Sequence, residues 1–177
     1  MVTPREPQLR QANSRDLPEL NAVIEAAVMG WNLPERVKRL ALPSYRYDEH
    51  DLDHLDLWVA QIPPALVGVV ALEPADRREL PNGQCGLLLH GLYVHPEYQH
   101  QGIGRQLLQL AEQQVRERQL DGLLVRAQSG AGEFFAAQGM QTLETRDEGR
   151  DYQYRYWKTV TPQAESTMNE TPPPTGK

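Results

Sequence analysis

A nearly continuous apolar segment, followed by a glycine-containing turn and a helical pattern, constrains the fold of this chain more than any other feature. Residues 85–94 read CGLLLHGLYV, and such an unbroken apolar run is typical of a buried central strand. Residues 103–115 then place apolar side chains three or four positions apart, which predicts an amphipathic helix. Gly102 and Gly104 stand where this helix begins. The sequence therefore predicts a central strand, a tight turn and a helix in direct succession.

The other segments alternate between strand and helix patterns. Strands are expected at residues 8–12, on either side of Pro63-Pro64, at residues 121–129 and as a final pair between residues 141 and 160. Helices are expected at residues 14–30, with Ser14 as the N-cap, at residues 34–42, closed by Pro43, and at residues 132–139. The polar segment 45–56 reads as a loop. This order predicts an α/β protein with a mixed sheet.

Length and composition fit one ordinary domain. The chain has 177 residues and a net charge of -6, which gives no support for nucleic acid as a partner. No apolar run is long enough to span a membrane and the first residues lack the apolar core of a signal peptide, so a cytoplasmic protein without a membrane partner is expected. Cys85 is the only cysteine, which excludes an internal disulfide. We expect a single domain over residues 1–160 and a disordered tail over residues 161–177.

The two glycines mark the best candidate for a binding site. A helix start leaves backbone N–H groups without partners and carries a partial positive charge, so a glycine turn at that point favours a phosphate site. The Rossmann motif is excluded because Leu107 stands where its third glycine is needed. The P-loop is excluded because Arg105 and Gln106 follow Gly104. A tight turn that only starts a helix, with no ligand, is the alternative.

Three short motifs carry a family resemblance. Residues 94–98 read VHPEY, residues 99–104 read QHQGIG, and residues 134–140 read FFAAQGM. The second resembles the acetyl-CoA-binding motif Gln/Arg-x-x-Gly-x-Gly/Ala of the GNAT N-acetyltransferase superfamily, and the others resemble its Val-x-Pro-x-Tyr and Phe-Tyr-x-x-x-Gly-Phe segments. The resemblance implies a mixed, mostly antiparallel sheet flanked by helices, with a V-shaped splay between two central strands.

The resemblance also implies where acetyl-CoA, the co-substrate, would bind. The strand backbone would pair with pantetheine inside the V, and amides of the turn would hold the pyrophosphate. Arg105 would add charge or would be a solvated first-turn residue, and Ser129 would contact pantetheine or cap the next helix. The implied cofactor-binding residues are Leu92, Tyr93, Val94, Gln99, His100, Gln101, Gly102, Ile103, Gly104, Arg105, Ser129 and Phe135.

His90 is the candidate general base. It lies in the apolar strand, and because side chains alternate we expect it to share a face with Leu88 and Leu92. Imidazole exchanges protons near neutral pH, which suits deprotonation of an amine. A hydrogen-bonded core histidine without a catalytic role is the alternative.

The sequence shows no obvious general acid. Phe135 stands where many members of the resembled family carry a tyrosine, and phenylalanine has no proton to donate. Tyr93, Tyr152 and Tyr154 are substitutes whose hydroxyls the sequence does not place, and packing on a sheet is their alternative role.

The polar segment 48–56 carries two histidines and five carboxylates. Its charged residues are Asp48, Glu49, His50, Asp51, Asp53, His54 and Asp56. We expect no metal site, because no apolar periodicity supports a helix that would bring His50 and His54 onto one face. The resemblance implies instead that this segment walls the acceptor site, where its carboxylates would attract a cationic amine. A solvated acidic loop is the alternative.

The leading hypothesis is an acyltransferase that moves an acetyl group from acetyl-CoA to a primary amine of a small molecule or a peptide. A catalytically weak or inactive acyl-CoA-binding module is the second class, favoured by Phe135. A nucleotide-binding protein is the third. The sequence leaves the acceptor open, and also whether the chain forms a homodimer.

Overall fold

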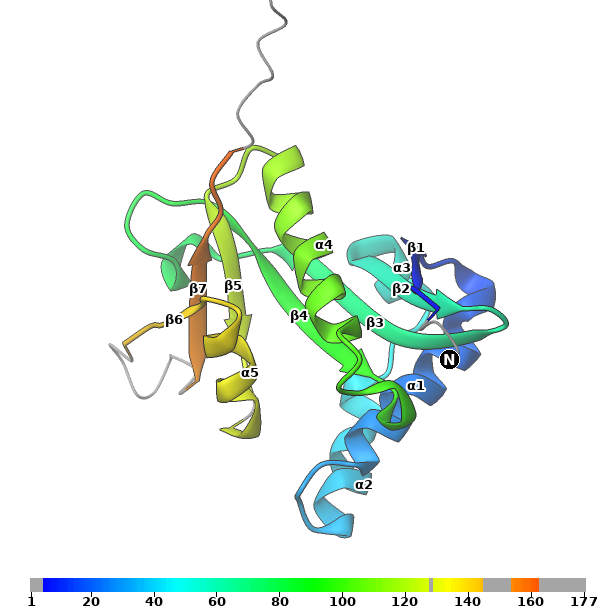
Figure 1. The fold of residues 1–177 in the computed structure, drawn as a ribbon. Helices are drawn as coiled ribbons and strands as arrows, with labels where there is room; N and C mark the ends of the chain where they lie inside the picture. Colours follow the sequence, from blue (N-terminus) through cyan, green and yellow to red (C-terminus); the bar gives the residue numbers. More distant parts are fainter. Residues whose placement is uncertain (1–4, 128, 145–153, 163–177) are drawn as a thin grey trace, which may run out of the picture.

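A mixed sheet forms the centre of the structure, a computed structural model that describes residues 5–127, 129–144 and 154–162 (Figure 1). Within these residues seven strands lie in the order β1-β2-β3-β4-β5-β7-β6. Only β4 and β5 run parallel, and all other neighbours are antiparallel. The strands are β1 (Gln8–Gln11), β2 (Asp56–Ile62), β3 (Ala65–Pro74), β4 (Gly86–Val94), β5 (Gly122–Arg126), β6 (Gln141–Thr142) and β7 (Arg155–Thr159). The expected fold class is thereby confirmed.

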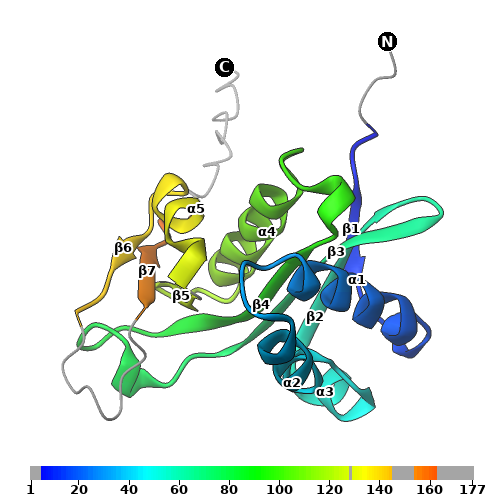
Figure 2. The same ribbon diagram turned by 90° about the horizontal axis from the view of Figure 1, so that it is seen from below.

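Helices cover both faces of the sheet. They are α1 (Leu17–Met29), α2 (Glu35–Tyr45), α3 (Glu49–His54), α4 (Ile103–Glu117) and α5 (Gly132–Ala137). Figure 2 shows α4 and α5 on one side of the sheet and α2 and α3 on the other. No helix in the described part of the chain is both long and apolar enough to cross a bilayer.

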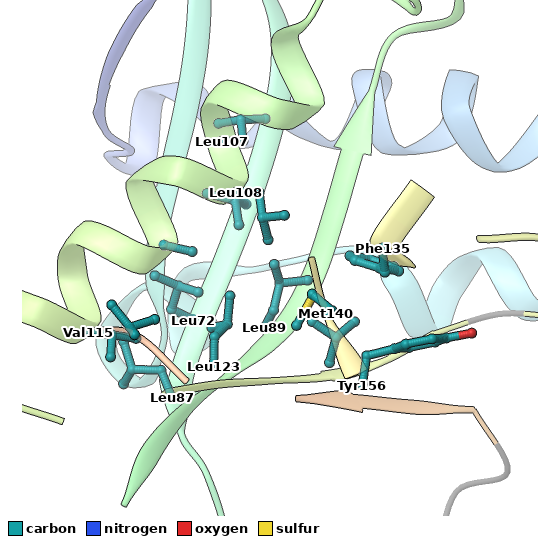
Figure 3. Close-up of a cluster of buried hydrophobic side chains, with 14 of the residues drawn as sticks. Leu72, Leu87, Leu89, Leu107, Leu108, Val115, Leu123, Phe135, Met140 and Tyr156 are labelled. Carbon is teal, nitrogen blue, oxygen red and sulfur yellow. The ribbon is translucent and has the colours of Figure 1, made fainter. Parts of the chain in front are cut away.

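Two of the apolar clusters in the described residues hold α1 and α4 on the sheet. The cluster under α4 joins Leu107, Leu108 and Val115 to strand residues that include Leu72, Leu87 and Leu123 (Figure 3). The cluster on the opposite face joins the α1 residues Leu20, Ile24 and Val28 to Val59, Val69 and Tyr93. Since a fully buried leucine or valine contributes about 1.5–3 kcal/mol, these clusters fix α1 and α4 firmly on the sheet.

Two predicted helix ends are wrong. Pro43 was expected to close the second helix, but α2 continues to Tyr45 with Pro43 inside it. Proline lacks one backbone N–H, and in the last turn this loss affects a single hydrogen bond. The cap expected at Ser14 belongs to Asn13, whose side chain accepts from the N–H of Arg15 at the start of a 3-10 turn, Ser14–Asp16.

The segment predicted as a loop contains α3. The Asp48 side chain accepts from the N–H of Asp51 at 3.0 Å, and the Asp51 side chain accepts from the N–H of Asp48 at 2.9 Å. This reciprocal capping box satisfies orphan amide groups at the helix start. It explains how six residues without apolar periodicity form a helix, and why a reading based on periodicity missed it.

The aromatic strand near the end of the chain divides its large side chains between two faces. Tyr156 packs in the α4 cluster, whereas Trp157 packs with Leu88 and Leu124 on the other face. Tyr152, the predicted turn at residues 147–149 and residues 163–177 of the predicted tail lie outside the described residues.

Candidate functional site

Strands β4 and β5 pair at one end only and then diverge. Their parallel pairing runs from Gly86↔Gly122 to Leu89↔Val125. β4 continues to Val94 and stays paired with β3 on its other edge. Figure 1 shows the two strands separating toward their C-terminal ends. Residues 90–94 of β4 therefore have one edge that no strand of the described sheet covers, which is the expected V-shaped splay.

A β-bulge lies at the start of this free edge. In the β3–β4 register Ala71 pairs with Gly91 and Leu72 pairs with Leu89, so His90 is the extra residue. A bulge leaves one residue unpaired and changes the alternation of side chains. Leu89 and Leu92 accordingly both contact the cluster under α4.

The bulge corrects the predicted environment of His90. The side chain does not share a face with Leu92, because its ring lies 5.9 Å from that of Tyr47, which belongs to the cluster under α1. The Nδ1 atom of His90 lies 3.0 Å from Oε1 of Glu73, and the two side chains are 42% and 31% exposed. His90 is thus accessible and hydrogen-bonded rather than a core histidine. Sequence reasoning missed Glu73 because its partner lies 17 positions away across two strands.

Two buried tyrosines, Tyr47 and Tyr93, pack on the sheet face toward which His90 points. Both are buried, at 5% and 8% exposure. Burial raises the pKa of Tyr47 well above its ordinary value, and the negative charges of Asp51 and Glu73 add to this shift. Burial also raises the pKa of Tyr93. Both hydroxyls therefore stay protonated at neutral pH, and carboxylates supply the negative charge near His90.

The turn after β4 is held by its own side chains. Gln99 donates from Nε2 to the carbonyl of Val94 at 3.1 Å, and Gln101 donates from Nε2 to the carbonyl of Glu97 at 3.2 Å. His100 is exposed and adopts a φ of 61°, and Gly102 follows with a φ of 84° as the N-cap of α4. A left-handed conformation favours glycine, which accounts for Gly102.

The second glycine is not required by the protein's own packing. A Cβ atom on Gly104 would lie 3.4 Å from the Phe134 ring and 3.7 Å from Cγ2 of Val94, which are ordinary contact distances. Its absence leaves the first turn of α4 bare between Phe134 and Val94. The adjacent Ile103 buries its side chain in the core, so only its backbone is available there. Phe134, which sequence reasoning did not include in the site, forms the α5 wall.

Along residues 92–95 the backbone N–H and C=O groups point alternately toward β3 and toward the uncovered edge of β4. The N–H of His95 donates to the carbonyl of Val67 on β3 at 2.9 Å, so the backbone groups of Tyr93 face β3 as well. Those of Leu92 and Val94 then face the splay, in agreement with the bond that the Val94 carbonyl accepts from Gln99. Of the three predicted strand residues, two turn their backbone polar groups toward the open edge.

The remaining predicted residues lie around α4 and α5. Arg105 is exposed and borders a cavity of about 410 Å³ together with Gln109, Gln138 and Lys158. Ser129 begins the 3-10 turn Ser129–Ala131, its side chain lies outside the described residues, and the cap of α5 is Ala131. Most of the predicted cofactor residues thus lie where β4, β5, α4 and α5 meet, whereas the side chain of Tyr93 packs on the opposite face, in the cluster under α1.

The two histidines of α3 lie on one helix face, contrary to the loop prediction. Their rings are 4.0 Å apart, and Nδ1 of His54 lies 2.8 Å from the carbonyl of His50. Among the described residues no group of three His, Cys, Asp or Glu side chains has a geometry that would hold a metal ion. Of the nearby acids, Asp56 is paired with Arg118.

The comparison with known families decides the assignment. The model of the "Acetyltransferase (GNAT) family" matches residues 25–140, which is more than half of the chain. The chain belongs to the GNAT family. It is therefore an acyltransferase of the N-acetyltransferase type. The match covers the bulge, the glycine turn and α5. No curated protein matches the sequence significantly.

Solved structures show the same GNAT fold at low sequence identity. The PaiA N-acetyltransferase of Thermoplasma acidophilum, in complex with coenzyme A, is 19% identical, with a TM-score of 0.68 over 88% of this chain and 99% of that one. A GCN5-related N-acetyltransferase of Rhodopseudomonas palustris is 20% identical, with a TM-score of 0.67 over 90% and 99%. A GNAT acetyltransferase of Brucella melitensis, in complex with acetyl-CoA, is 19% identical, with a TM-score of 0.60 over 88% and 89%.

Proposed function

We propose that this chain transfers the acetyl group of acetyl-CoA to a primary amine of a small molecule or a protein. One observation carries the proposal: the uncovered edge of β4 leads directly into the bare first turn of α4, and the His90–Glu73 pair flanks the same edge. Family membership supports acetyl transfer, and two similar structures hold coenzyme A or acetyl-CoA.

The residues present fit the co-substrate. The backbone N–H and carbonyl of Leu92 and the N–H of Val94 offer an extended edge to the amides of pantetheine, while the Val94 carbonyl accepts from Gln99. The first-turn amides of α4 have no helical acceptor and suit a diphosphate, and nothing lies within 4 Å of the position where a Gly102 side chain would begin. Arg105, which lines the adjacent cavity, adds positive charge. Gln99, His100 and Gln101 shape the turn that presents these amides.

His90 acts as the base in this proposal. An ionised Glu73 accepts only, so Nδ1 of neutral His90 carries the proton and Nε2 keeps its lone pair. That lone pair takes a proton from the incoming amine, whose nitrogen then attacks the thioester carbonyl. The N–H of Leu92, which faces the splay, is placed to stabilise the oxygen as charge develops on it.

The acceptor side carries negative charge. Glu73 and Asp51 act electrostatically on Tyr47, which lies beside His90. A protonated amine is attracted to such a surface and loses its proton only when it reaches His90. We therefore propose a cationic acceptor.

The alternative is an acyl-CoA-binding module without turnover, which Phe135 favours. Release of the coenzyme A thiol, measured with panels of polyamines, amino acids, aminoglycosides and peptides, separates the two functions. The proposed function requires turnover of at least one amine and its loss in the His90→Ala variant. Thermal stabilisation by acetyl-CoA without turnover of any amine would support the module instead.

A further inference from the structure

Tyr156, a residue only 8% exposed, carries a hydroxyl that has no part in the proposed function. The inference drawn from it rests on the proposed acetyl transfer. When the carbon–sulfur bond breaks, the electron pair stays on sulfur, and a positioned proton donor accelerates such a step. Phe134 and Phe135, the α5 residues beside the splay, have no acidic proton. If protonation of the departing sulfur is assisted by the protein, a residue outside α5 must supply the proton.

Tyr156 lies level with the point where the central strands separate. It pairs with Val125 on β5, and Val125 in turn pairs with Leu89, the last residue at which β4 and β5 are joined. All three side chains belong to the cluster under α4. The side chain of Leu89, where β4 and β5 begin to separate, and the ring of Tyr156 thus lie on the same face of the sheet.

The ring of Tyr156 is fixed by stacking on Phe135. The two ring centroids are 5.8 Å apart with an interplanar angle of 29°, and Tyr156 is only 8% exposed. Figure 3 shows the two rings together at the edge of the cluster, with the hydroxyl oxygen at the end that points away from the leucines. The hydroxyl is therefore presented next to the position where the family resemblance leads one to expect a tyrosine.

The hydroxyl points at the first residue of α5. A Cβ atom built on Gly132 would lie 2.6 Å from the Tyr156 oxygen, so only a glycine at 132 leaves room for it. Within the described residues this oxygen makes no hydrogen bond to the protein, and it is not one of the fully enclosed unpaired side-chain atoms, so water or a ligand can reach it. An accessible hydroxyl on a ring that is held by stacking is available to a ligand.

We propose that Tyr156 is the proton donor to the departing sulfur of coenzyme A. The amine nitrogen forms a bond to the carbonyl carbon, the carbon–sulfur bond breaks, and the Tyr156 hydroxyl proton passes to the sulfur. The protonated amine gives one proton to His90 before it attacks, and its nitrogen gives a second proton to the tyrosinate once the bond to carbon has formed. The products are the amide, the free thiol and one proton, which His90 passes to solvent. In this chain the hydroxyl absent from Phe135 is supplied from β7.

Single-turnover rates of acetyl transfer test the assignment. Tyr156→Phe removes one oxygen from a stacked ring and is expected to lower the rate about a hundredfold, without a change in melting temperature. Gly132→Ala should act in the same direction because its Cβ displaces the hydroxyl. Tyr154→Phe, which removes a hydroxyl from the 39% exposed residue just before β7, is the matched control and should keep the parent rate. Adding Phe135→Tyr to Tyr156→Phe should restore at least a tenth of the parent rate.

A binding measurement tests the contact without turnover. Calorimetry with coenzyme A and with desulfo-coenzyme A, which lacks the sulfur, should show that Tyr156→Phe weakens the first about fivefold and leaves the second unchanged. Equal effects on both ligands, or none, would overturn the contact.

The two levels of the proposal fail in different ways. If the parent protein acetylates an amine and Tyr156→Phe transfers at the same rate, the donor assignment is wrong and the proposed function stands. If the parent acetylates no amine, both are wrong. If Tyr156→Phe is slow but Phe135→Tyr gives no recovery while the fold is intact, the hydroxyl supports the site without donating to the sulfur and the assignment is overturned.

Discussion

The Nδ1 atom of His90 lies 3.0 Å from Oε1 of Glu73, and a β-bulge creates this contact. Without the bulge, strict alternation would place His90 on the same face as Leu92, which contacts the cluster under α4. With it, the imidazole reaches the opposite face, where Glu73 and Tyr47 lie. The same bulge marks the position where β4 leaves β5. The candidate base and the open strand edge therefore share one structural cause.

The first prediction concerns this pair. Glu73→Gln should lower the maximal rate of acetyl transfer about tenfold with little change in the KM for acetyl-CoA, because it loosens the orientation and tautomer of His90. His90→Gln should lower the rate about a hundredfold. Long-range ¹⁵N spectra of the imidazole should show a proton on Nδ1 in the parent and a mixture of tautomers in Glu73→Gln. A parent spectrum with the proton on Nε2 would contradict the proposed orientation.

The second prediction concerns the turn. Gly102→Ala should cost about 1–2 kcal/mol of stability because of the positive φ of 84°, and should weaken coenzyme A binding at least tenfold by reorienting the amides at the start of α4. Gly83 is the matched control: it has a φ of 77° and open space around it, in a loop remote from the splay. Gly83→Ala should lose similar stability and keep its affinity. Calorimetry with unchanged affinity in both variants would contradict the phosphate site.

The third prediction concerns acid stability. Asp16 accepts from both terminal nitrogens of Arg10 at 2.8 Å each, and this pairing holds the pKa of the Asp16 carboxyl below its usual range. Because the folded-state pKa is the lower one, the stabilisation is complete above pH ~4, the unfolded value, and is lost as the pH falls through the folded-state value.

Asp16→Asn should therefore lower the free energy of unfolding by about 1–2 kcal/mol at pH 7. The difference from the parent should shrink steadily in urea titrations below pH ~4, where the unfolded carboxyl takes up its proton. A difference that stays constant down to pH ~2 would show that the ion pair does not act through ionisation of Asp16.

The fourth prediction concerns Gly122, the first residue of β5, where this strand packs closely against β7. A Cβ on Gly122 would lie 2.4 Å from the carbonyl oxygen of Lys158 and 2.5 Å from the Trp157 ring. Because a backbone atom cannot yield as a side chain does, Gly122→Ala should destabilise the protein by about 3 kcal/mol. Gly130→Ala, with nothing within 4 Å, is the control and should change stability by less than about 1 kcal/mol. Equal melting temperatures for the two variants would contradict the packing described.

The sequence alone determined the order of the main elements and the location of the glycine turn. Apolar patterns are local properties of the sequence: periodicity identified α1 and α4, and an unbroken apolar run identified the central strand. The motif at residues 99–104 indicated the family that the comparison confirmed. The sequence patterns failed at α3, where a capping box stabilises a helix that has no apolar periodicity. They also failed at Pro43, because a proline is tolerated in the last turn of a helix.

The tertiary structure alone decided which side chains meet. A bulge depends on the register between two strands, and no local pattern in residues 85–94 encodes it. The partners His90 and Glu73, Phe134 and Gly104, and Tyr156 and Phe135 are brought together by strand pairing and helix packing across the sheet. Such contacts join residues from separate elements, and their geometry exists only once the sheet has set the distance between them.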